Sequence, residues 1–576
     1  MSLFKRLLLS TAILFLVIIS ACNTMESSKN IKHQFKNPIL AGFYPDPSIC
    51  KVGSDYYLIN SSFSYFPGIP LFHSKNLVSW KLIGHVMNRP EQMKLDGLTL
   101  SRGIFAPAIS YNDGTFYVVC TLVDAGGNFV VTSSKPEGPW SNPVFIPQIN
   151  GIDPSLFFDE DGKAYIVYNS IPPNNESLYG GHRTIRMYEF DKNNLKVVGD
   201  EKILINGGTD ISKKPIWIEG PHIYKVNDMY YLMCAEGGTS NDHSEVIFRS
   251  EKIEGPYVSY ENNPILTQRH LDPKRENAIT CTGHADMVQL DSGDWWAVFL
   301  GCRPYPPCEE NYFNTGRETF MAPVKWIDGW PVINPDHELV QYSYDYPIPS
   351  KEKINQAPYG GNFTVSDEFN SKELGRDWQF LRTPHEKWYE LNKNKGGLII
   401  QLRPETCSGL MNPSFIGRRQ QHLNSSAMTS MKFEAKSENE KAGLLIFQSE
   451  NNYYLLCKSI SDKNQVIQLY QSIKAEDESD QLKLLTEHKL QSANSTDPVY
   501  LKIASKGSVY SFYYSLDNMK WALLQDKVDG TFLSTKTAGG FVGSMFALYA
   551  TSLGKESNNL ASFNWFEYMG NDHTND

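Results

Sequence analysis

A recurring strand–turn–strand pattern constrains the fold of this chain more than any other feature. Each copy has an apolar strand, a turn containing Asn, Asp or Gly, and a second strand rich in aromatic residues. Five copies occur, starting about 47 to 66 residues apart, at residues 46–59, 106–119, 153–168, 219–233 and 283–299. That spacing is typical of a four-stranded blade with its loops. One hairpin cannot bury its own apolar face, whereas five hairpins around an axis can. The pattern therefore predicts an all-β protein with a five-bladed β-propeller.

Three of the copies begin with an acidic residue. Asp46, Asp153 and Glu219 place three carboxylates at what the alignment of the copies predicts to be equivalent points of separate blades. Equivalent points of a radial repeat can converge on its axis. An Asp-Pro-Ser sequence alone is a common turn, so either aspartate alone would be interpreted as structural. Their joint occurrence favours a catalytic group of three acids. The fifth copy has His284 in this place, which predicts a histidine near the axis.

The first 22 residues have the composition of an export signal. Lys5 and Arg6 precede a mostly apolar run at residues 7–19, and two small residues and Cys22 follow. This pattern is typical of a secretory signal, and the run is short for a membrane span of about 20 residues. The cysteine after Ile-Ser-Ala resembles a bacterial lipoprotein box, which implies lipid attachment at Cys22 and a place at the bacterial cell envelope. An uncleaved membrane anchor is the alternative. Residues 23–36 are polar enough for a tether.

Composition narrows the class of partner. The formal net charge of −10, without a basic stripe, disfavours a nucleic-acid partner. Aromatic residues make up 12% of the chain, which suits an all-β protein with stacking surfaces for ligands. Cys50, Cys120 and Cys234 fall in predicted strands, which favours buried free thiols. Cys302 and Cys308 flank a proline-rich turn and could pair, and no cysteine spacing resembles a zinc site.

The strand patterns divide the chain into two domains. The propeller is predicted at residues 37–345 and is followed by a proline-rich linker at 346–361. Short strands with turn signals then run through residues 362–570, which suits a two-sheet β-sandwich of the concanavalin or jelly-roll type.

Five short motifs carry a family resemblance. They are Tyr-Pro-Asp-Pro-Ser at 44–48, Gly-Ile-Asp-Pro-Ser-Leu at 151–156, Ile-Glu-Gly-Pro-His at 218–222, Gly-His-Ala at 283–285 and Gly-Arg-Glu-Thr at 316–319. In this order they resemble glycoside hydrolase family 43, five-bladed propeller enzymes that act on pentose polymers. The likeness covers nearly all of the mature chain. Its C-terminal half resembles the concanavalin-like sandwich of the family's β-xylosidases, including Gly-Arg-Arg-Gln-Gln-His at 417–422.

The resemblance assigns roles to the acids. Asp46 would be the general base, Glu219 the general acid, and Asp153 a third carboxylate that tunes the acid and orients substrate. Inverting hydrolysis needs an ionised carboxylate to activate water and a protonated acid for the leaving oxygen, about 6.5–9.5 Å apart. A nearby ionised Asp153 would raise the pKa of Glu219. Arg317 would keep Asp46 ionised and could hold a sugar hydroxyl.

Other residues match the family's sugar pocket. Phe105 stands where similar β-xylosidases often have tryptophan and Ile152 where some have phenylalanine, which leaves the sugar preference open. Phe546 would belong to a sandwich loop that closes the pocket. The residues expected to contact substrate are Arg317, His284, Phe63, Phe105, Ile152, Thr239 and Phe546. No cofactor is expected to be required, although relatives suggest a water-linked calcium at the propeller axis near His284.

The leading interpretation is an inverting hydrolase that releases xylose from the non-reducing ends of xylo-oligosaccharides or xylan. An α-L-arabinofuranosidase acting on arabinoxylan or arabinan is the closest alternative. A surface glycan-binding lipoprotein without turnover is the alternative from another class, and it would predict loss of one carboxylate. The expected partners are the saccharide substrate and, through the lipid alone, a membrane.

Overall fold

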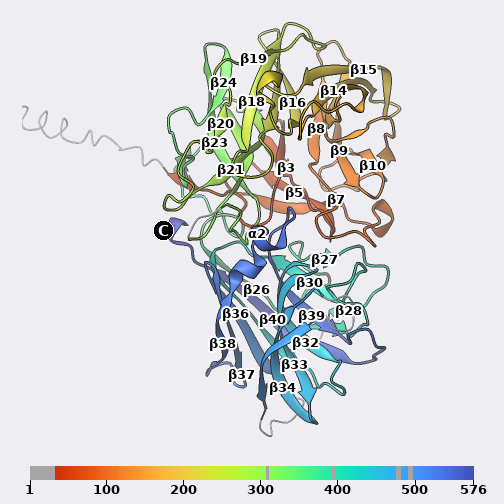
Figure 1. Cartoon of the computed structure of the whole chain (residues 1–576), viewed down its shortest axis with the longest axis vertical. Helices are drawn as coiled ribbons and strands as arrows, with labels where there is room; N and C mark the ends of the chain where they lie inside the picture. The colour runs from red at the N-terminus through yellow and green to blue at the C-terminus, as the bar shows by residue number, and fades with distance from the viewer. Residues whose placement is uncertain (1–32, 307–309, 392–396, 475–481, 491–496, 576) are drawn as a thin grey trace, which may run out of the picture.

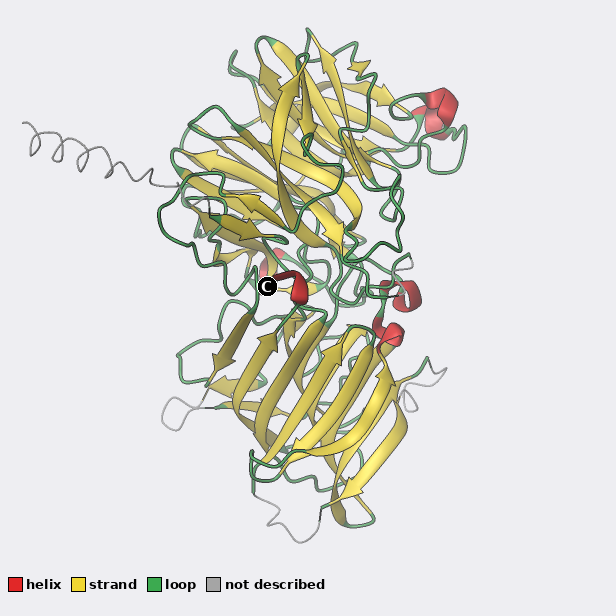
Figure 2. Ribbon diagram, turned by 90° about the vertical axis from the view of Figure 1, so that its left-hand side faces the viewer, coloured by secondary structure: helices red, strands yellow, loops and turns green. Residues whose placement is uncertain are grey.

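The computed structural model describes residues 33–306, 310–391, 397–474, 482–490 and 497–575. Two β domains follow one another along the chain (Figure 1). The N-terminal propeller runs from red to green, and the C-terminal sandwich runs from cyan to blue. Strands dominate both domains, and the few helices are short (Figure 2). Cys22 and the predicted signal lie outside the described residues.

Five separate antiparallel sheets of four or five strands form the propeller blades. Blade one contains β2 (Ser48–Val52), β3 (Asp55–Ile59), β5 (Gly68–Ser74) and β6 (Lys81–Met87). Blade two contains β7 (Gly103–Ile104), β8 (Ala108–Asn112), β9 (Thr115–Val123), β10 (Gly127–Ser133) and β11 (Val144–Phe145). Blade three contains β12 (Gly151–Phe158), β13 (Ala164–Ser170), β14 (Thr184–Asp191) and β15 (Lys196–Asn206). Blade four contains β16 (Glu219–Val226), β17 (Met229–Glu236), β18 (Ser244–Ser250), β19 (Val258–Ser259) and β20 (Leu266–Thr267). Blade five contains β21 (Thr280–Gln289), β22 (Trp295–Cys302), β23 (Glu318–Ile327) and β24 (Trp330–Ile333).

Apolar layers between blades hold the propeller together. Tyr117 and Ile166 belong to a layer between blades two and three, and Val167 and Leu232 to the next layer, between blades three and four. Every second residue of a strand points to the same face, so the alternating apolar residues of each hairpin supply these layers. The five sequence copies are therefore the first hairpins of the five blades, as predicted.

The propeller begins before the predicted boundary at residue 37. Strand β1 (Gln34–Lys36) pairs with β25 (Ser343–Asp345), and Phe35 is fully buried. The last residues of the predicted tether therefore belong to the fold, because their burial removes an aromatic side chain from water. The predicted linker also lies against this core, where Tyr346 and Tyr359 are buried.

Two sheets face each other in the C-terminal domain. The larger sheet contains β26 (Phe363–Asp367), β28 (Tyr389–Leu391), β29 (Leu398–Gln401), β31 (Asn424–Lys432), β36 (Val499–Lys506), β37 (Val509–Ser515), β38 (Ala522–Asp529) and β40 (Leu560–Gly570). The smaller sheet contains β30 (Phe415–Arg419), β32 (Lys441–Ser449), β33 (Asn452–Ser461), β34 (Asn464–Ser472), β35 (Leu482–Lys489) and β39 (Met545–Thr551). The domain is thus the predicted sandwich.

The two domains interlock through backbone contacts. Strand β4 (Tyr65–Phe66) of the propeller pairs with β27 (Phe380–Leu381), which precedes the smaller sheet. The Arg419 Nε atom donates to the Phe43 carbonyl at 2.5 Å, and Gln421 Nε2 donates to the Ala41 carbonyl at 3.1 Å. The polar motif at residues 417–422 is therefore an interface motif that supports the segment leading to Asp46.

Buried thiols remain free in the described residues. Cys120 and Cys234 are buried as predicted, whereas Cys50 is partly exposed. Cys302 packs with Cys281 and Phe313, and Cys308 lies outside the described residues, so the possible Cys302–Cys308 pair stays a prediction.

Within the described ranges, no helix is both long and apolar enough to cross a membrane.

Candidate active site

A β-bulge at the start of the innermost strand aims side chains at the propeller axis. In blade three the register shifts between Ile152 and Ser155, so Asp153 and Pro154 together oppose a single partner residue. Blades four and five have the same shift after Glu219 and after Gly283. The first of the two bulged residues has a left-handed backbone in each case, with φ of 54° at Asp153, 56° at Gly220 and 52° at His284. Asp46 in blade one has the same conformation, with φ of 51°. Non-glycine residues in this region are strained by about 1–3 kcal/mol, and such strain is concentrated at functional sites.

This register corrects one prediction. Glu219 is not equivalent to Asp46 and Asp153, because the bulged residue of blade four is Gly220. Glu219 instead occupies the position of Ile152, one residue earlier. A side chain at residue 220 would meet the His284 ring, since a Cβ atom there would lie 2.9 Å from His284 Nε2. His284 of blade five therefore occupies the space that a side chain at position 220 of blade four would need. In blades one and three the equivalent residue is an acid, Asp46 or Asp153.

The three acids nevertheless line one cavity of about 280 Å³. Asp46, Asp153 and Glu219 are each only 5–6% exposed. The cavity walls are otherwise mostly apolar, and the remaining lining residues are Phe63, Phe105, Ala106, Ile152, Ile216, Trp217, Gly238, Thr239, His284, Arg317 and Phe541.

Hydrogen bonds and a positive charge keep Asp46 ionised. Arg317 Nη1 donates to Asp46 Oδ1 at 2.9 Å, and Ser61 Oγ donates to Asp46 Oδ2 at 2.6 Å. His284 Nδ1 lies 4.0 Å from Oδ1. Burial by itself would raise the pKa of Asp46, but Arg317, His284 and the Ser61 hydrogen bond outweigh it and lower the pKa below its ordinary value. Asp46 is therefore a carboxylate at neutral pH.

The other two acids hold protons more tightly. Burial, followed by the charge of Asp46, raises the pKa of Asp153 to about 7, although a Gly220 backbone hydrogen bond opposes the shift. Burial also raises the pKa of Glu219 well above its ordinary value, and Asp153 and Asp46 add to the effect. The prediction that Asp153 raises the pKa of Glu219 therefore has the right sign, while burial is the larger cause. Burial and the two neighbouring acids thus favour the protonated form of Glu219.

The surroundings in the pocket thus favour the ionised form of Asp46 and the protonated form of Glu219. The carboxylate can remove a proton from water, and the acid can give one to a departing oxygen. The low polarity of the walls strengthens both interactions because it excludes water.

The side chains around His284 bear on the predicted calcium site. In the described residues no group of three or more His, Cys, Asp or Glu side chains is arranged to hold a metal ion. The pKa of His284 is lowered to about 4, chiefly by burial, so the ring is neutral and can accept or donate a hydrogen bond. The side chains therefore do not form a complete calcium site, and a calcium ion would take most of its ligands from water. Calcium binding stays a prediction.

Most predicted pocket residues lie in the cavity, and Phe546 does not. Arg317, His284, Phe63, Phe105, Ile152 and Thr239 all line it. Phe546 lies within β39, between Arg418 of β30 and Ile446 of β32, and is fully buried in the sandwich core. The sandwich residue that reaches the pocket is Phe541, in the loop before β39, whose ring lies 5.9 Å from the rings of Phe63 and Phe105. Phe546 was predicted to lie in the loop that closes the pocket, but that place belongs to Phe541. The sequence did not separate the two because both are phenylalanines, five positions apart, one in the loop and one in the strand.

Ile216 and Trp217 also line the pocket, and the sequence motifs did not predict them. Trp217 has a φ of 57°, and its N–H donates to the Gly181 carbonyl at 2.8 Å. Ile216 and Trp217 lie three and two residues before Glu219, so their closeness in sequence to the proposed acid was a signal that could have been used.

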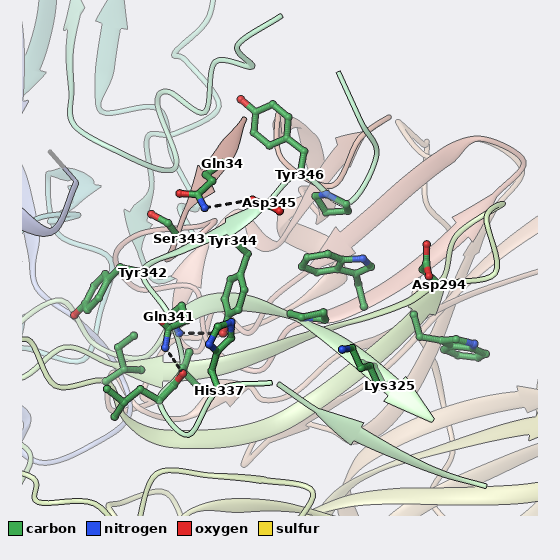
Figure 3. A pocket seen from close by; sticks show the side chains of 18 of the residues that line it. Gln34, Asp294, Lys325, His337, Gln341, Tyr342, Ser343, Tyr344, Asp345 and Tyr346 are labelled. Atoms are coloured by element: carbon green, nitrogen blue, oxygen red, sulfur yellow. Dashed lines mark hydrogen bonds between the residues drawn. The ribbon is translucent and has the colours of Figure 1, made fainter. Parts of the chain in front are cut away.

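A larger cavity of about 990 Å³ lies elsewhere, against blade five and β25 (Figure 3). Its labelled carboxylates, Asp294 and Asp345, belong to separate segments, and Asp345 accepts a hydrogen bond from Gln34 at 3.3 Å. Asp46, Asp153 and Glu219 do not line it, so it is not the catalytic pocket.

A small pocket on a five-bladed propeller, with one acid held as a carboxylate and another whose surroundings favour its protonated form, is typical of a hydrolase of glycosides. Known proteins agree with this class. Residues 35–331 match the family model for glycosyl hydrolases family 43, and residues 366–569 match that for the beta xylosidase C-terminal concanavalin A-like domain. The chain belongs to glycosyl hydrolases family 43.

Named relatives cover nearly the whole chain. It is 38% identical over 540 residues to a non-reducing end alpha-L-arabinofuranosidase of Bacteroides ovatus, covering 93% of this chain and 94% of that protein. It is 37% identical over 537 residues to a xylosidase/arabinosidase of Butyrivibrio fibrisolvens, covering 92% and 98%. A solved GH43_12 protein from a capybara gut metagenome superposes with a TM-score of 0.83 at 39% identity, covering 92% of this chain and 97% of that one.

Proposed function

We propose that the protein is an inverting, exo-acting β-xylosidase that releases xylose from the non-reducing ends of xylo-oligosaccharides. The observation that carries this is the unequal surroundings of Asp46 and Glu219 in one pocket. Arg317 and Ser61 donate hydrogen bonds to Asp46, whereas Glu219 is buried near the carboxyl groups of Asp153 and Asp46. Asp46 activates water, and Glu219 protonates the leaving oxygen. Asp153 orients the sugar and keeps Glu219 protonated. The cavity of about 280 Å³, capped by Phe541, favours a single sugar unit and therefore cleavage at chain ends.

An α-L-arabinofuranosidase on the same scaffold is the second candidate. The relative from Bacteroides ovatus bears that name, and the one from Butyrivibrio fibrisolvens is called a xylosidase/arabinosidase. Phe105 and Ile152 line the pocket where the resemblance leaves the sugar preference open.

One experiment tests the reaction and the sugar together. The purified protein is given aryl β-D-xyloside, aryl α-L-arabinofuranoside and natural xylo- and arabino-oligosaccharides, and the first product is followed by proton NMR. We expect the faster reaction on xylosides and a product of inverted anomeric configuration. A retained anomer would overturn the roles of Asp46 and Glu219. Faster release of arabinose would replace the xylosidase by the second candidate.

The proposal includes the location of the protein in the cell. The signal pattern and Cys22 support export and lipid attachment at the bacterial cell envelope, where oligosaccharides from polymer breakdown would be met.

A further inference from the structure

Three arginines stack on aromatic rings of the catalytic pocket. The distances from the guanidinium carbon to the ring centroid are 5.7 Å for Arg102 over Phe105, 5.5 Å for Arg317 over Phe541 and 3.8 Å for Arg183 over Trp217. Arg183 makes the closest stack of the three. Stacking of this kind fixes a guanidinium plane while leaving its edge free for hydrogen bonds.

The three arginines differ in their carboxylate partners. Arg102 pairs with Asp124 at 2.6 Å, and Arg317 pairs with Asp46 at 2.9 Å. Among the described residues, no carboxylate lies within 4.0 Å of the Arg183 guanidinium, and no hydrogen bond from it is formed. The side chain is only partly exposed, and burial lowers its pKa. The stack on Trp217 therefore fixes the Arg183 guanidinium, while its N–H groups have no acceptor among the described residues.

The backbone around Arg183 is anchored, so the free donors are not those of a loose surface side chain. The Arg183 carbonyl accepts a hydrogen bond from Gly207 N at 2.9 Å. The neighbouring Gly181 carbonyl accepts one from Trp217 N at 2.8 Å, which ties the segment of Arg183 to the pocket rim. A guanidinium that is already positioned loses little freedom when a ligand binds.

Arg183 borders the catalytic pocket through Trp217. Trp217 lines the cavity two residues before Glu219, and Arg183 interacts electrostatically with the Glu219 carboxyl group. This step rests on the proposed function, in which Glu219 protonates the oxygen between the released sugar and the rest of the substrate. The next sugar of the substrate must therefore pass close to Glu219 and its neighbours.

We propose that Arg183, stacked on Trp217, forms a subsite for an acidic leaving group, namely the carboxylate of a uronic acid attached to the sugar next to the released pentose. A guanidinium edge matches a carboxylate through two parallel hydrogen bonds. The segment that leads into Trp217 also carries the exposed Lys213 and Lys214, of which Lys213 pairs with Asp210 at 3.6 Å. Arg183 and Lys214 thus add positive charge beside Trp217, which favours an anion there over the neutral sugars of an unsubstituted chain.

Paired substrates test the subsite. The full-length protein and its Arg183→Gln variant are assayed at one pH on 4-carboxyphenyl and 4-carbamoylphenyl glycosides of the preferred pentose. The natural pair is xylobiose and a xylo-oligosaccharide whose penultimate sugar carries glucuronic acid. We expect Arg183→Gln to lower the ratio of kcat/KM for acidic over neutral substrate by roughly tenfold, as for loss of a charge-assisted hydrogen bond. Because the ratio compares two substrates at one pH, any change in the pKa of Glu219 cancels.

Arg102→Gln is the matched control, since this arginine also stacks on a pocket ring but is already paired with Asp124. The control should leave the ratio of acidic to neutral substrate unchanged, and Arg183→Lys should recover only part of it. An unchanged ratio in Arg183→Gln would overturn the subsite. If no pentoside is hydrolysed, the proposed function is wrong. The subsite is then tested by measuring the affinity for the acidic oligosaccharide by calorimetry. Glu219→Gln, with and without Arg183→Gln, would then be titrated with the acidic oligosaccharide, and equal affinities would refute the subsite.

Discussion

At the scale of single residues, the site depends on how differently two buried carboxyl groups are surrounded. Asp46 has a guanidinium at 2.9 Å and a hydroxyl at 2.6 Å, which stabilise its charge. Glu219 has two neighbouring carboxyl groups and burial, which disfavour its charge. The same kind of side chain therefore serves as base in one place and as acid in the other.

Removing each group should affect substrates differently. Glu219→Ala should lower hydrolysis of xylobiose by about 10²–10⁴-fold, the usual contribution of a general acid. A nitrophenyl pentoside should be affected far less, because nitrophenolate leaves without a proton. Asp46→Ala should impair both substrates together, since every substrate needs activated water. The measurement is kcat/KM on both substrates for both variants. Equal losses on the two substrates for Glu219→Ala would mean that Glu219 is not the acid.

Asp153 should set the basic limb of the pH profile. Its negative charge favours the protonated form of Glu219, so its removal lowers the pKa of Glu219. The pKa of Asp153 is about 7, so this charge is present mainly above neutral pH. Asp153→Asn should therefore move the basic limb of kcat/KM to lower pH and leave the acidic limb, set by Asp46, unchanged. A basic limb that stays in place would contradict this coupling.

At the scale of secondary structure, bulges and one loop build the pocket. The bulges at Asp153, Gly220 and His284 recur at the same register of three blades, so one local geometry places an acid, a glycine and a histidine at equivalent points. The loop before β39 adds Phe541 from the other domain. Its glycines permit this approach, because a Cβ at Gly543 would lie 2.4 Å from the Thr315 carbonyl.

Two phenylalanines of this region make a matched pair for testing the role of the loop. Phe541→Ala should raise KM by roughly tenfold, because it opens the sugar pocket and removes an aromatic contact. It should change stability little, since Phe541 is partly exposed. Phe546→Ala should leave KM unchanged and lower the free energy of unfolding by about 3–5 kcal/mol, as for a buried phenylalanine. Steady-state kinetics and denaturant unfolding of both variants check this. An unaltered KM in Phe541→Ala would show that the loop only joins the domains.

At the scale of the whole molecule, the sandwich supports the catalytic domain. Arg303 of the propeller is buried between Glu318 at 2.6 Å and Asp572, from the C-terminal end, at 2.7 Å. Glu318 directly follows Arg317, the partner of Asp46. The two domains thus share a buried ion cluster next to the base, and breaking such a cluster leaves an unpaired buried charge.

The N-terminus should act independently of this assembly. Cys22→Ala should abolish lipid attachment and move the protein from the membrane fraction to the soluble one, while kcat/KM stays unchanged because Cys22 precedes both domains. Cell fractionation and mass spectrometry of the N-terminal peptide check the result. Unaltered membrane association of the variant would indicate an uncleaved anchor instead.

The sequence alone determined the repeat, the two β domains and the acids Asp46, Asp153 and Glu219, because hairpin periodicity and short motifs are local properties of the chain. It did not reveal that Gly220, rather than Glu219, occupies the bulge, since register is set by pairing between strands. Tertiary structure alone decided that Phe541 caps the pocket while Phe546 packs in the core. It alone also showed that, within the part of the chain that the structure describes, Arg183 has no carboxylate at ion-pair distance, whereas Arg102 and Arg317 each have one. Contacts between distant segments arise only when the chain is folded.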